Sequence, residues 1–138
     1  MPGRAFVDTN VLVYAFDEGE PAKQALAREL LVTMEPDGFA VSAQVLNEFY
    51  VATTRKLARP LASEAAEQAV RALARLDVAP VDASLVLRGV ARARVSDLSL
   101  WDALIVEAAL RANCERILTE DLTPGQRFDD VTVVNPFE

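Results

Sequence analysis

The sequence of 138 residues contains no histidine and only one cysteine. Without histidine, a serine or cysteine nucleophile lacks its usual base, and metal-free cleavage by paired imidazoles is excluded. Cys114 alone can neither close an intrachain disulfide nor complete a thiolate zinc site, so we expect it to be a small core residue. The chemistry that remains open to this chain is that of carboxylates and metal ions.

Long apolar runs are also missing. No stretch approaches the roughly 18 apolar residues that a membrane span needs. The first four residues, Met-Pro-Gly-Arg, lead directly into a short apolar segment rather than a signal peptide. We therefore expect a cytoplasmic protein with no membrane contact. The length fits a single domain, residues 1–138, that can bury a core without disulfides or structural zinc.

Basic residues are outnumbered by acidic ones, 14 against 21, which gives a net charge of −7. This charge argues against binding to phosphate backbones by electrostatics alone. The distribution is uneven, because residues 51–96 hold eight basic and four acidic residues whereas the rest of the chain holds six and 17. The acidic excess therefore lies in the two ends of the chain.

Short apolar segments alternate with longer amphipathic ones along the whole sequence. We predict buried parallel strands, each short and apolar, at residues 5–7, 39–42, 78–81, 116–119 and 132–134. We predict helices at residues 10–16, 21–34, 43–57, 63–75, 82–94 and 99–112. Ser63, Asp82 and Ser99 are the expected N-caps of the last three helices. This alternation implies right-handed βαβ units and an α/β fold, a three-layer α/β/α sandwich with a central, mostly parallel five-stranded sheet.

Four acidic residues fall where such a fold would gather them. Asp8 and Asp121 follow predicted strands. Glu48 lies in the first two turns of the helix after a strand, and Asp102 lies in the first turn of its own helix. Ligands of parallel sheets collect beyond the carboxyl ends of the strands, so all four carboxylates can reach one pocket. Carboxylates suit Mg²⁺ or Mn²⁺ and repel each other unless a cation is present, so the pattern predicts a metal site.

Three of these acids have an ordinary structural alternative. Asp8 could be only a helix N-cap, and Glu48 could be a solvent-facing helical residue. Asp102 could complete a capping box that begins at Ser99. It lies, however, on an apolar side of its helix, where a carboxylate needs a partner to keep its charge. We therefore favour a functional role for Asp102.

Asp121 competes with its neighbour Glu120 for the fourth place. Successive residues of an extended segment point to opposite sides, so we expect only one of the two to face the pocket, and we choose Asp121. Asp97, Asp129 and Asp130 lie in predicted loops, where acids are usually just solvated, and are left out of the site.

Four sequence motifs occur in order and at sensible spacing across nearly the whole chain. They are FVDTNVLVY at 6–14, VLNEFY at 45–50, LWDALI at 100–105 and ILTEDL at 117–122, followed by Gly-Gln at 125–126 and Asn-Pro-Phe at 135–137. Together they resemble the motifs of PIN-domain proteins, and specifically of the VapC-type toxins of bacterial toxin–antitoxin pairs. Each motif alone is weak, but four in register are specific.

The resemblance implies a metal-dependent endoribonuclease. Its catalytic, metal-binding quartet would be Asp8, Glu48, Asp102 and Asp121, holding one or two Mg²⁺ or Mn²⁺ ions. Asn10 and Thr119 match polar residues that family members keep beside the acids, and we expect them to hydrogen-bond and orient the carboxylates. One ion would lower the pKa of a water and a second, about 4 Å away, would stabilise the leaving oxygen. The products would carry 5′-phosphate and 3′-hydroxyl ends.

The resemblance also implies partners. These are a homodimer mate, a small antitoxin protein that places an arginine among the acids, and single-stranded or looped RNA, including transfer RNA. Arg71 and Arg75, four residues apart on a predicted helix, could contact this RNA, as could Arg88 and Arg92. Such stripes are more often solvated surface.

Three alternative functions can be compared with this sequence. The chain could be a non-catalytic PIN-like module that binds RNA or a protein, with structural acids. A phosphotransferase of the haloacid-dehalogenase type is disfavoured, because such enzymes use Asp-x-Asp where this chain has Asp8-Thr9-Asn10. A phosphoaspartate receiver is also disfavoured, because it needs a lysine late in the chain.

Overall fold

The computed structural model describes residues 3–35 and 37–138 of the chain. Six strands form one sheet in the order β3-β2-β1-β4-β6-β5. In chain order the strands are β1 (Ala5–Val7), β2 (Phe39–Ser42), β3 (Asp77–Ala79), β4 (Arg116–Leu118), β5 (Arg127–Phe128) and β6 (Val131–Val134). The helices are α1 (Thr9–Tyr14), α2 (Pro21–Thr33), α3 (Ala43–Arg55), α4 (Ser63–Leu73), α5 (Ala83–Val95) and α6 (Leu100–Arg111).

The predicted fold class is confirmed, with a correction to the number of strands. The first five strands of the order are mutually parallel, as expected for βαβ units. A sixth strand, β5, pairs antiparallel with β6 at the sheet edge. It was missed because two residues are too short to show a period. The turn between β5 and β6 contains Asp129, whose φ of 54° is in the left-handed region that Asp tolerates better than most residues.

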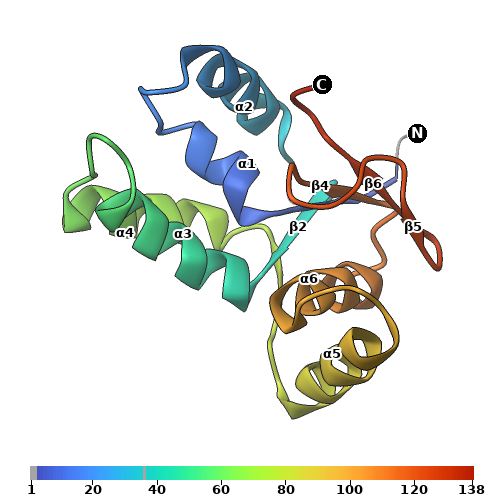
Figure 1. The fold of residues 1–138 in the computed structure, drawn as a ribbon. Helices are drawn as coiled ribbons and strands as arrows, with labels where there is room; N and C mark the ends of the chain where they lie inside the picture. Colours follow the sequence, from blue (N-terminus) through green and yellow to red (C-terminus); the bar gives the residue numbers. More distant parts are fainter. Residues whose placement is uncertain (1–2, 36) are drawn as a thin grey trace.

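Helices cover both faces of the sheet. Figure 1 shows α5 and α6 below the sheet and α1 and α2 above it, and α3 packs against both α1 and α4. All of β1 is buried, and α6 buries seven consecutive residues, Ala103–Ala109, against the sheet on one side and α5 on the other. Cys114 is buried as predicted, and burial raises the pKa of its thiol to about 11.

The helix caps follow the sequence with one exception. Asp82 and Ser99 cap α5 and α6 as predicted, since their side chains accept hydrogen bonds from the backbone N–H groups of Leu85 and Asp102. Ser63 is not a cap. The N-cap of α4 is Ala62, which has no side-chain acceptor, and Ser63 is the first helical residue. Helix and strand ends otherwise differ from the prediction by one or two residues, the usual fraying range.

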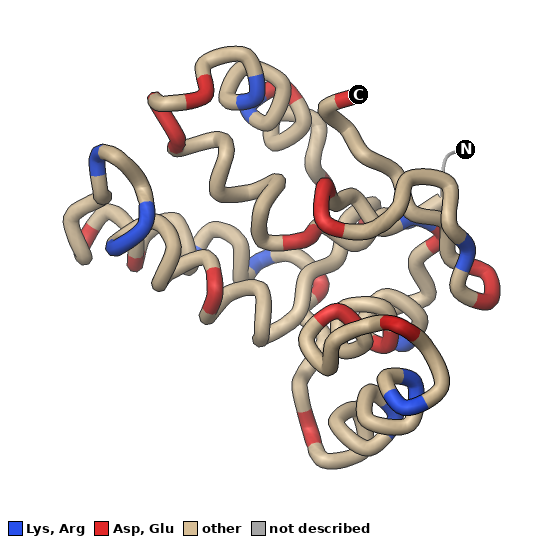
Figure 2. The backbone as a smooth tube through the Cα atoms, viewed as in Figure 1, with Lys and Arg blue, Asp and Glu red and all other residues tan. Residues whose placement is uncertain are grey.

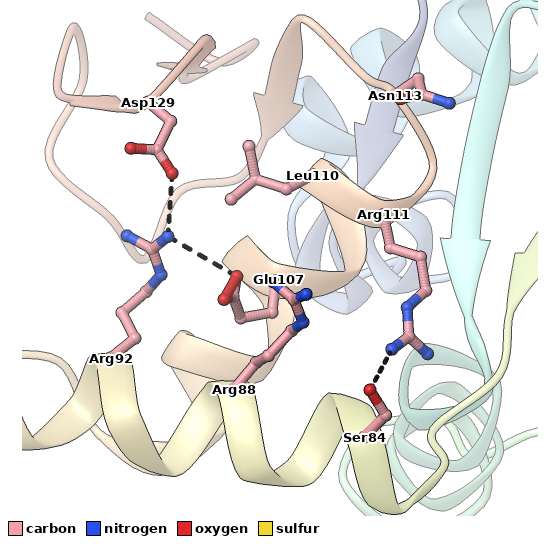
Figure 3. Close-up of a pocket in the computed structure, with 8 residues that line it drawn as sticks. All are labelled: Ser84, Arg88, Arg92, Glu107, Leu110, Arg111, Asn113 and Asp129. Atoms are coloured by element: carbon pink, nitrogen blue, oxygen red, sulfur yellow. Dashed lines mark hydrogen bonds and ion pairs between the residues drawn. The ribbon is translucent and has the colours of Figure 1, made fainter.

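Helix α5 packs closely against α6 at Gly89 and is also linked to it by an ion pair. A Cβ on Gly89 would lie 2.7 Å from Leu104 Cδ2, so glycine permits the close contact. Arg92 forms ion pairs with Glu107 on α6 at 3.5 Å and with Asp129 at 3.1 Å, which are drawn as dashed lines in Figure 3.

Basic and acidic positions are interspersed along the whole chain, as Figure 2 shows. No helix in residues 3–35 and 37–138 is long and apolar enough to cross a membrane.

Candidate active site

Asp8 lies where β1 passes into α1, and it is 7% exposed. Its backbone N–H donates to the carbonyl of Leu118 at 3.0 Å, which extends the parallel pairing of β1 with β4. Its Oδ1 accepts from the N–H of Thr9 at 2.7 Å, and its Oδ2 accepts from the hydroxyl of Thr119 at 2.8 Å. Asp8 is therefore an N-cap, as the ordinary reading proposes, and is also fixed at the carboxyl edge of the two central strands.

A hydrogen-bonded cluster joins the end of β1 to the segment after β4. Asn10 Nδ2 donates to Asp121 Oδ2 at 3.0 Å and to Thr119 Oγ1 at 3.2 Å. The backbone N–H of Asp121 donates to the same Thr119 oxygen at 3.1 Å, and that of Glu120 donates to Asn10 Oδ1 at 3.2 Å. Asn10 and Thr119 thus contact both Asp8 and Asp121, because Asn10 Nδ2 also lies 3.4 Å from Asp8 Oδ2.

Glu120 faces away from this cluster. Lys23 lies 2.8 Å from its carboxylate, and the hydroxyl of Tyr14 also hydrogen-bonds to it. Burial raises the pKa of Glu120, but the bonds from Lys23 and Tyr14 outweigh burial and hold the pKa below its usual value. Phe137 of the closing motif packs edge-on against the Tyr14 ring at 5.0 Å between centroids. The side chains of Glu120 and Asp121 therefore have different partners, as the alternation of an extended segment predicts.

Asp102 and Glu48 approach the cluster from two helices. Asp102 is half-buried in the first turn of α6, where its N–H donates to Ser99 Oγ at 3.1 Å. Burial and the charge of Asp121 raise the pKa of Asp102, while hydrogen bonding with Ser99 opposes the rise. Glu48 is exposed on α3, and its charge acts on Asp8. Electrostatic repulsion therefore couples Asp102 to Asp121 and Glu48 to Asp8.

The pKa of Asp8 is raised from 3.8 to about 6. Burial is the main cause. Hydrogen bonds from Thr119 and Thr9 lower the pKa, whereas the charges of Asp121 and Glu48 raise it further. The site is therefore one in which carboxylates repel each other and only part of the charge is compensated by donors from the protein.

The carboxylate oxygens of this site are suitable ligands for a hard divalent cation, but they are not arranged around one point. Within the described part of the chain, no group of three or more Asp, Glu or Cys side chains is close enough to hold a metal ion as it stands. Oxygen ligands and uncompensated negative charge are what Mg²⁺ and Mn²⁺ select. Glu48 and Asp121 are exposed, and Asn10 donates to the Asp121 carboxylate, whereas Asp8 is buried and fixed by Thr9 and Thr119.

The basic residues singled out in the sequence lie in different settings. Arg71 pairs with Glu67, one turn earlier on α4, at 3.0 Å. Arg75 lies beyond the end of α4 at Leu73, so the two arginines do not share a helix face as predicted. Arg88 and Arg92 do line one pocket of about 540 Å³ between α5 and α6 (Figure 3). Two acidic side chains of that pocket, Glu107 and Asp129, pair with Arg92.

Sequence reasoning assigned no role to Trp101 or Gln44. Both line a pocket of about 600 Å³ beside Glu48. A signal was present in the sequence, because Trp101 is the only tryptophan of the chain and directly precedes Asp102. Its exposure, however, could not be deduced from a helix that is apolar on nearly every side.

Comparison with known proteins decides the family. The PIN domain family model matches residues 5–131. The chain belongs to the PIN domain family. A search of curated proteins finds no significant match to it.

Solved structures share the PIN fold over almost the full length. A toxin–antitoxin complex from Klebsiella pneumoniae superimposes with a TM-score of 0.71 at 22% identity, covering 97% of this chain and 98% of that one. VapC20 from Mycobacterium tuberculosis, described as a toxin that cleaves the sarcin–ricin loop, gives 0.69 at 23% identity over 85% and 91% of the two chains. FitAcB from Neisseria gonorrhoeae gives 0.66 at 20% identity over 96% and 98%. At these identities the likeness establishes the shared PIN fold.

Proposed function

We propose that this PIN domain is a metal-dependent endoribonuclease, the toxin of a VapBC-type toxin–antitoxin pair. The observation that carries the proposal is the state of Asp8. It is buried at the carboxyl edge of the central strands, held by Thr9 and Thr119, and destabilised by the charges of Asp121 and Glu48. A buried acid with a perturbed pKa at the ligand-binding edge of an α/β sheet is a strong functional candidate.

The metal ligands in this proposal are Asp8, Asp102 and Asp121, with Glu48 either binding an ion or positioning the attacking water. When bound, one or two Mg²⁺ or Mn²⁺ ions supply a low-pKa water and neutralise charge on the phosphate. Thr119 and Thr9 hold the Asp8 carboxylate in one orientation, since each donates to a different oxygen. Asn10 ties Asp121 to the same frame. The chain has no imidazole, so the acid–base groups that this site offers beside the water are carboxylates.

The substrate and partners are proposed by analogy with the structural relatives. VapC20 is described as a toxin that cleaves the sarcin–ricin loop, and the Klebsiella structure is a toxin–antitoxin complex. By analogy, the substrate of this chain is a single-stranded or looped RNA, transfer RNA among the candidates. Its partners are a homodimer mate and an antitoxin whose arginine enters the acidic site. We place its action in the cytoplasm, where such RNA is found.

The test is cleavage of total RNA with Mg²⁺, Mn²⁺ or chelator, followed by mapping of the cut ends. Wild type is compared with Asp8→Asn and with Asp130→Asn, an exposed acid in the β5–β6 turn that serves as a matched control. Metal-dependent cuts that leave 5′-phosphates, lost only in Asp8→Asn, support the proposal. Equal cleavage by folded Asp8→Asn would remove Asp8 from the mechanism.

One observation favours a second candidate, a PIN module that binds RNA or protein without cutting. The described acids are not gathered around a common metal position. Calorimetric titration with Mn²⁺ separates the two functions. Binding by wild type that is lost in Asp8→Asn, without binding changes in Asp130→Asn, favours the nuclease. Absence of Mn²⁺ binding together with RNA binding favours the non-catalytic module.

A further inference from the structure

A wide pocket adjoins the acidic cluster. Helix α3 contributes Gln44 and Glu48 to its lining, and α6 contributes Trp101 and Leu104. Its volume of about 600 Å³ lies in the range of ligand sites. Glu48 also lines a smaller neighbouring pocket together with Thr9, the residue that donates to the Asp8 carboxylate. The wide pocket therefore shares Glu48 with the proposed acidic site.

Trp101 gives this pocket a flat aromatic surface. The side chain is 64% exposed, although tryptophan is usually well buried, and it immediately precedes Asp102. Exposed aromatic rings serve as stacking platforms for single-stranded nucleic acid, because every base has a π-face. The net charge of −7 gives this chain little attraction for phosphates, so a substrate RNA needs contacts to its bases.

Gln44 adds a hydrogen-bonding group to the lining of the same pocket. Its Nε2 donates to the backbone carbonyl of Trp101 at 3.4 Å, which ties the amide to the start of α6. Its Oε1 is buried and has no hydrogen-bond partner among the described residues. A buried acceptor without a donor costs free energy, and rotation of the Gln44 side chain, which breaks only the 3.4 Å bond to Trp101, would bring Oε1 within reach of an N–H on the edge of a nucleobase.

We propose that this pocket binds one unpaired nucleobase beside the cleaved phosphodiester. The base stacks on Trp101, and Gln44 accepts a hydrogen bond from its edge. The inference rests on the proposed ribonuclease function and adds a substrate-reading subsite to it. A base in a duplex cannot present its face to a protein ring, so the subsite restricts cleavage to single strands and loops.

The first test uses the intrinsic fluorescence of Trp101, which is the only tryptophan of the chain. Asp8→Asn protein, which should not cut RNA, is titrated with decauridylate, decaadenylate and a decamer backbone that lacks bases. Stacking predicts quenching by the two base-containing RNAs and none by the abasic one. RNA binding, followed by anisotropy of a labelled RNA, that leaves the fluorescence unchanged would overturn the proposal.

The second test compares cleavage of a mixed-sequence single-stranded RNA by variants of the otherwise intact enzyme. Trp101→Ala should lower kcat/KM by roughly 5- to 150-fold, the range for loss of one stacked base, mainly through KM. Trp101→Phe should restore most of it. Leu87→Ala removes a side chain that is 70% exposed on α5 and should change nothing. Gln44→Met, which keeps the size but not the acceptor, should change which base is preferred beside the cut.

These outcomes separate the subsite from the proposed function. Normal cleavage by a folded Trp101→Ala variant overturns the base-binding subsite and leaves the ribonuclease intact. Failure of the wild type to cleave any RNA removes the ribonuclease, while base-dependent quenching would still support a base-binding pocket. Far-UV circular dichroism and a urea midpoint equal to wild type show that each variant is folded.

Discussion

Replacing Asp8 by Asn should stabilise the metal-free protein while abolishing RNA cleavage. The pKa of Asp8 is raised from 3.8 to about 6, so folding disfavours its charged form. Below pH 3.8, Asp8 is protonated in both the folded and the unfolded state, so it does not lower the free energy of unfolding. Between pH 3.8 and about 6 the unfolded state loses its proton first, and the free energy of unfolding falls. Above pH 6 the full penalty applies.

The magnitude comes from the size of the shift. Two pKa units correspond to about 3 kcal/mol at 1.36 kcal/mol per unit. Asn keeps one acceptor for the Thr9 N–H but loses charge-assisted bonding to Thr119, which costs about 1 kcal/mol or more. The net gain expected at pH 8 is therefore about 1–2 kcal/mol. For a domain of this size that is a rise in Tm of about 3–8 °C.

The assay is urea unfolding in chelator at pH 4 and pH 8, with Asp130→Asn as the matched exposed control. Asp8→Asn should be equal to wild type or less stable at pH 4 and more stable at pH 8. Adding Mg²⁺ at pH 8 should stabilise wild type but not Asp8→Asn, because only the carboxylate gains from the cation. A stability difference between Asp8→Asn and wild type that is the same at both pH values would refute the reasoning.

Two other perturbations follow from the contacts, and a third tests the effect of positive charge on RNA binding. Thr119→Val removes the hydroxyl that donates to Asp8, so the pKa of Asp8 should rise and the pH–rate profile of RNA cleavage should shift upward; an unchanged profile would separate Thr119 from the site. Arg92→Leu leaves Glu107 buried without its partner and should cost about 3 kcal/mol in urea unfolding at pH 7, whereas a loss below 0.5 kcal/mol, roughly the effect of a surface change, would contradict the pairing. Arg71→Glu combined with Arg75→Glu should weaken RNA binding in a filter assay without changing Mn²⁺ affinity; unchanged binding would make both ordinary surface residues.

Much of the fold was predictable because local patterns and the sheet agree. The apolar triplet of β1 is followed directly by the N-cap Asp8, so adjacent residues indicate the end of the strand and the start of the helix. The caps at Asp82 and Ser99 were equally local. The edge strand β5 was not predictable, because two residues carry no period and it is defined only by its pairing with β6.

The sequence predicts the members of the candidate site, but it does not predict their contacts. Parallel topology alone places Asp8 and Asp121 at one edge, since both follow strands that are neighbours in the sheet. The contact of Asn10 with Asp121 spans 111 positions in the chain, and only the side-by-side placement of β1 and β4 creates it. Which of Glu120 and Asp121 joins the cluster also depends on tertiary contacts, because Tyr14 of α1 and Lys23 of α2 bind Glu120.

The sequence by itself determined the α/β class, the PIN family and the four acids proposed for the site, because these depend on residue type, period and order along the chain. Only the tertiary structure decided that Asp8 is buried enough to raise its pKa and that Trp101 is left exposed beside Asp102. Burial and exposure are properties of what packs against a residue. In this chain those neighbours come from strands and helices far apart in sequence, so no local pattern encodes them.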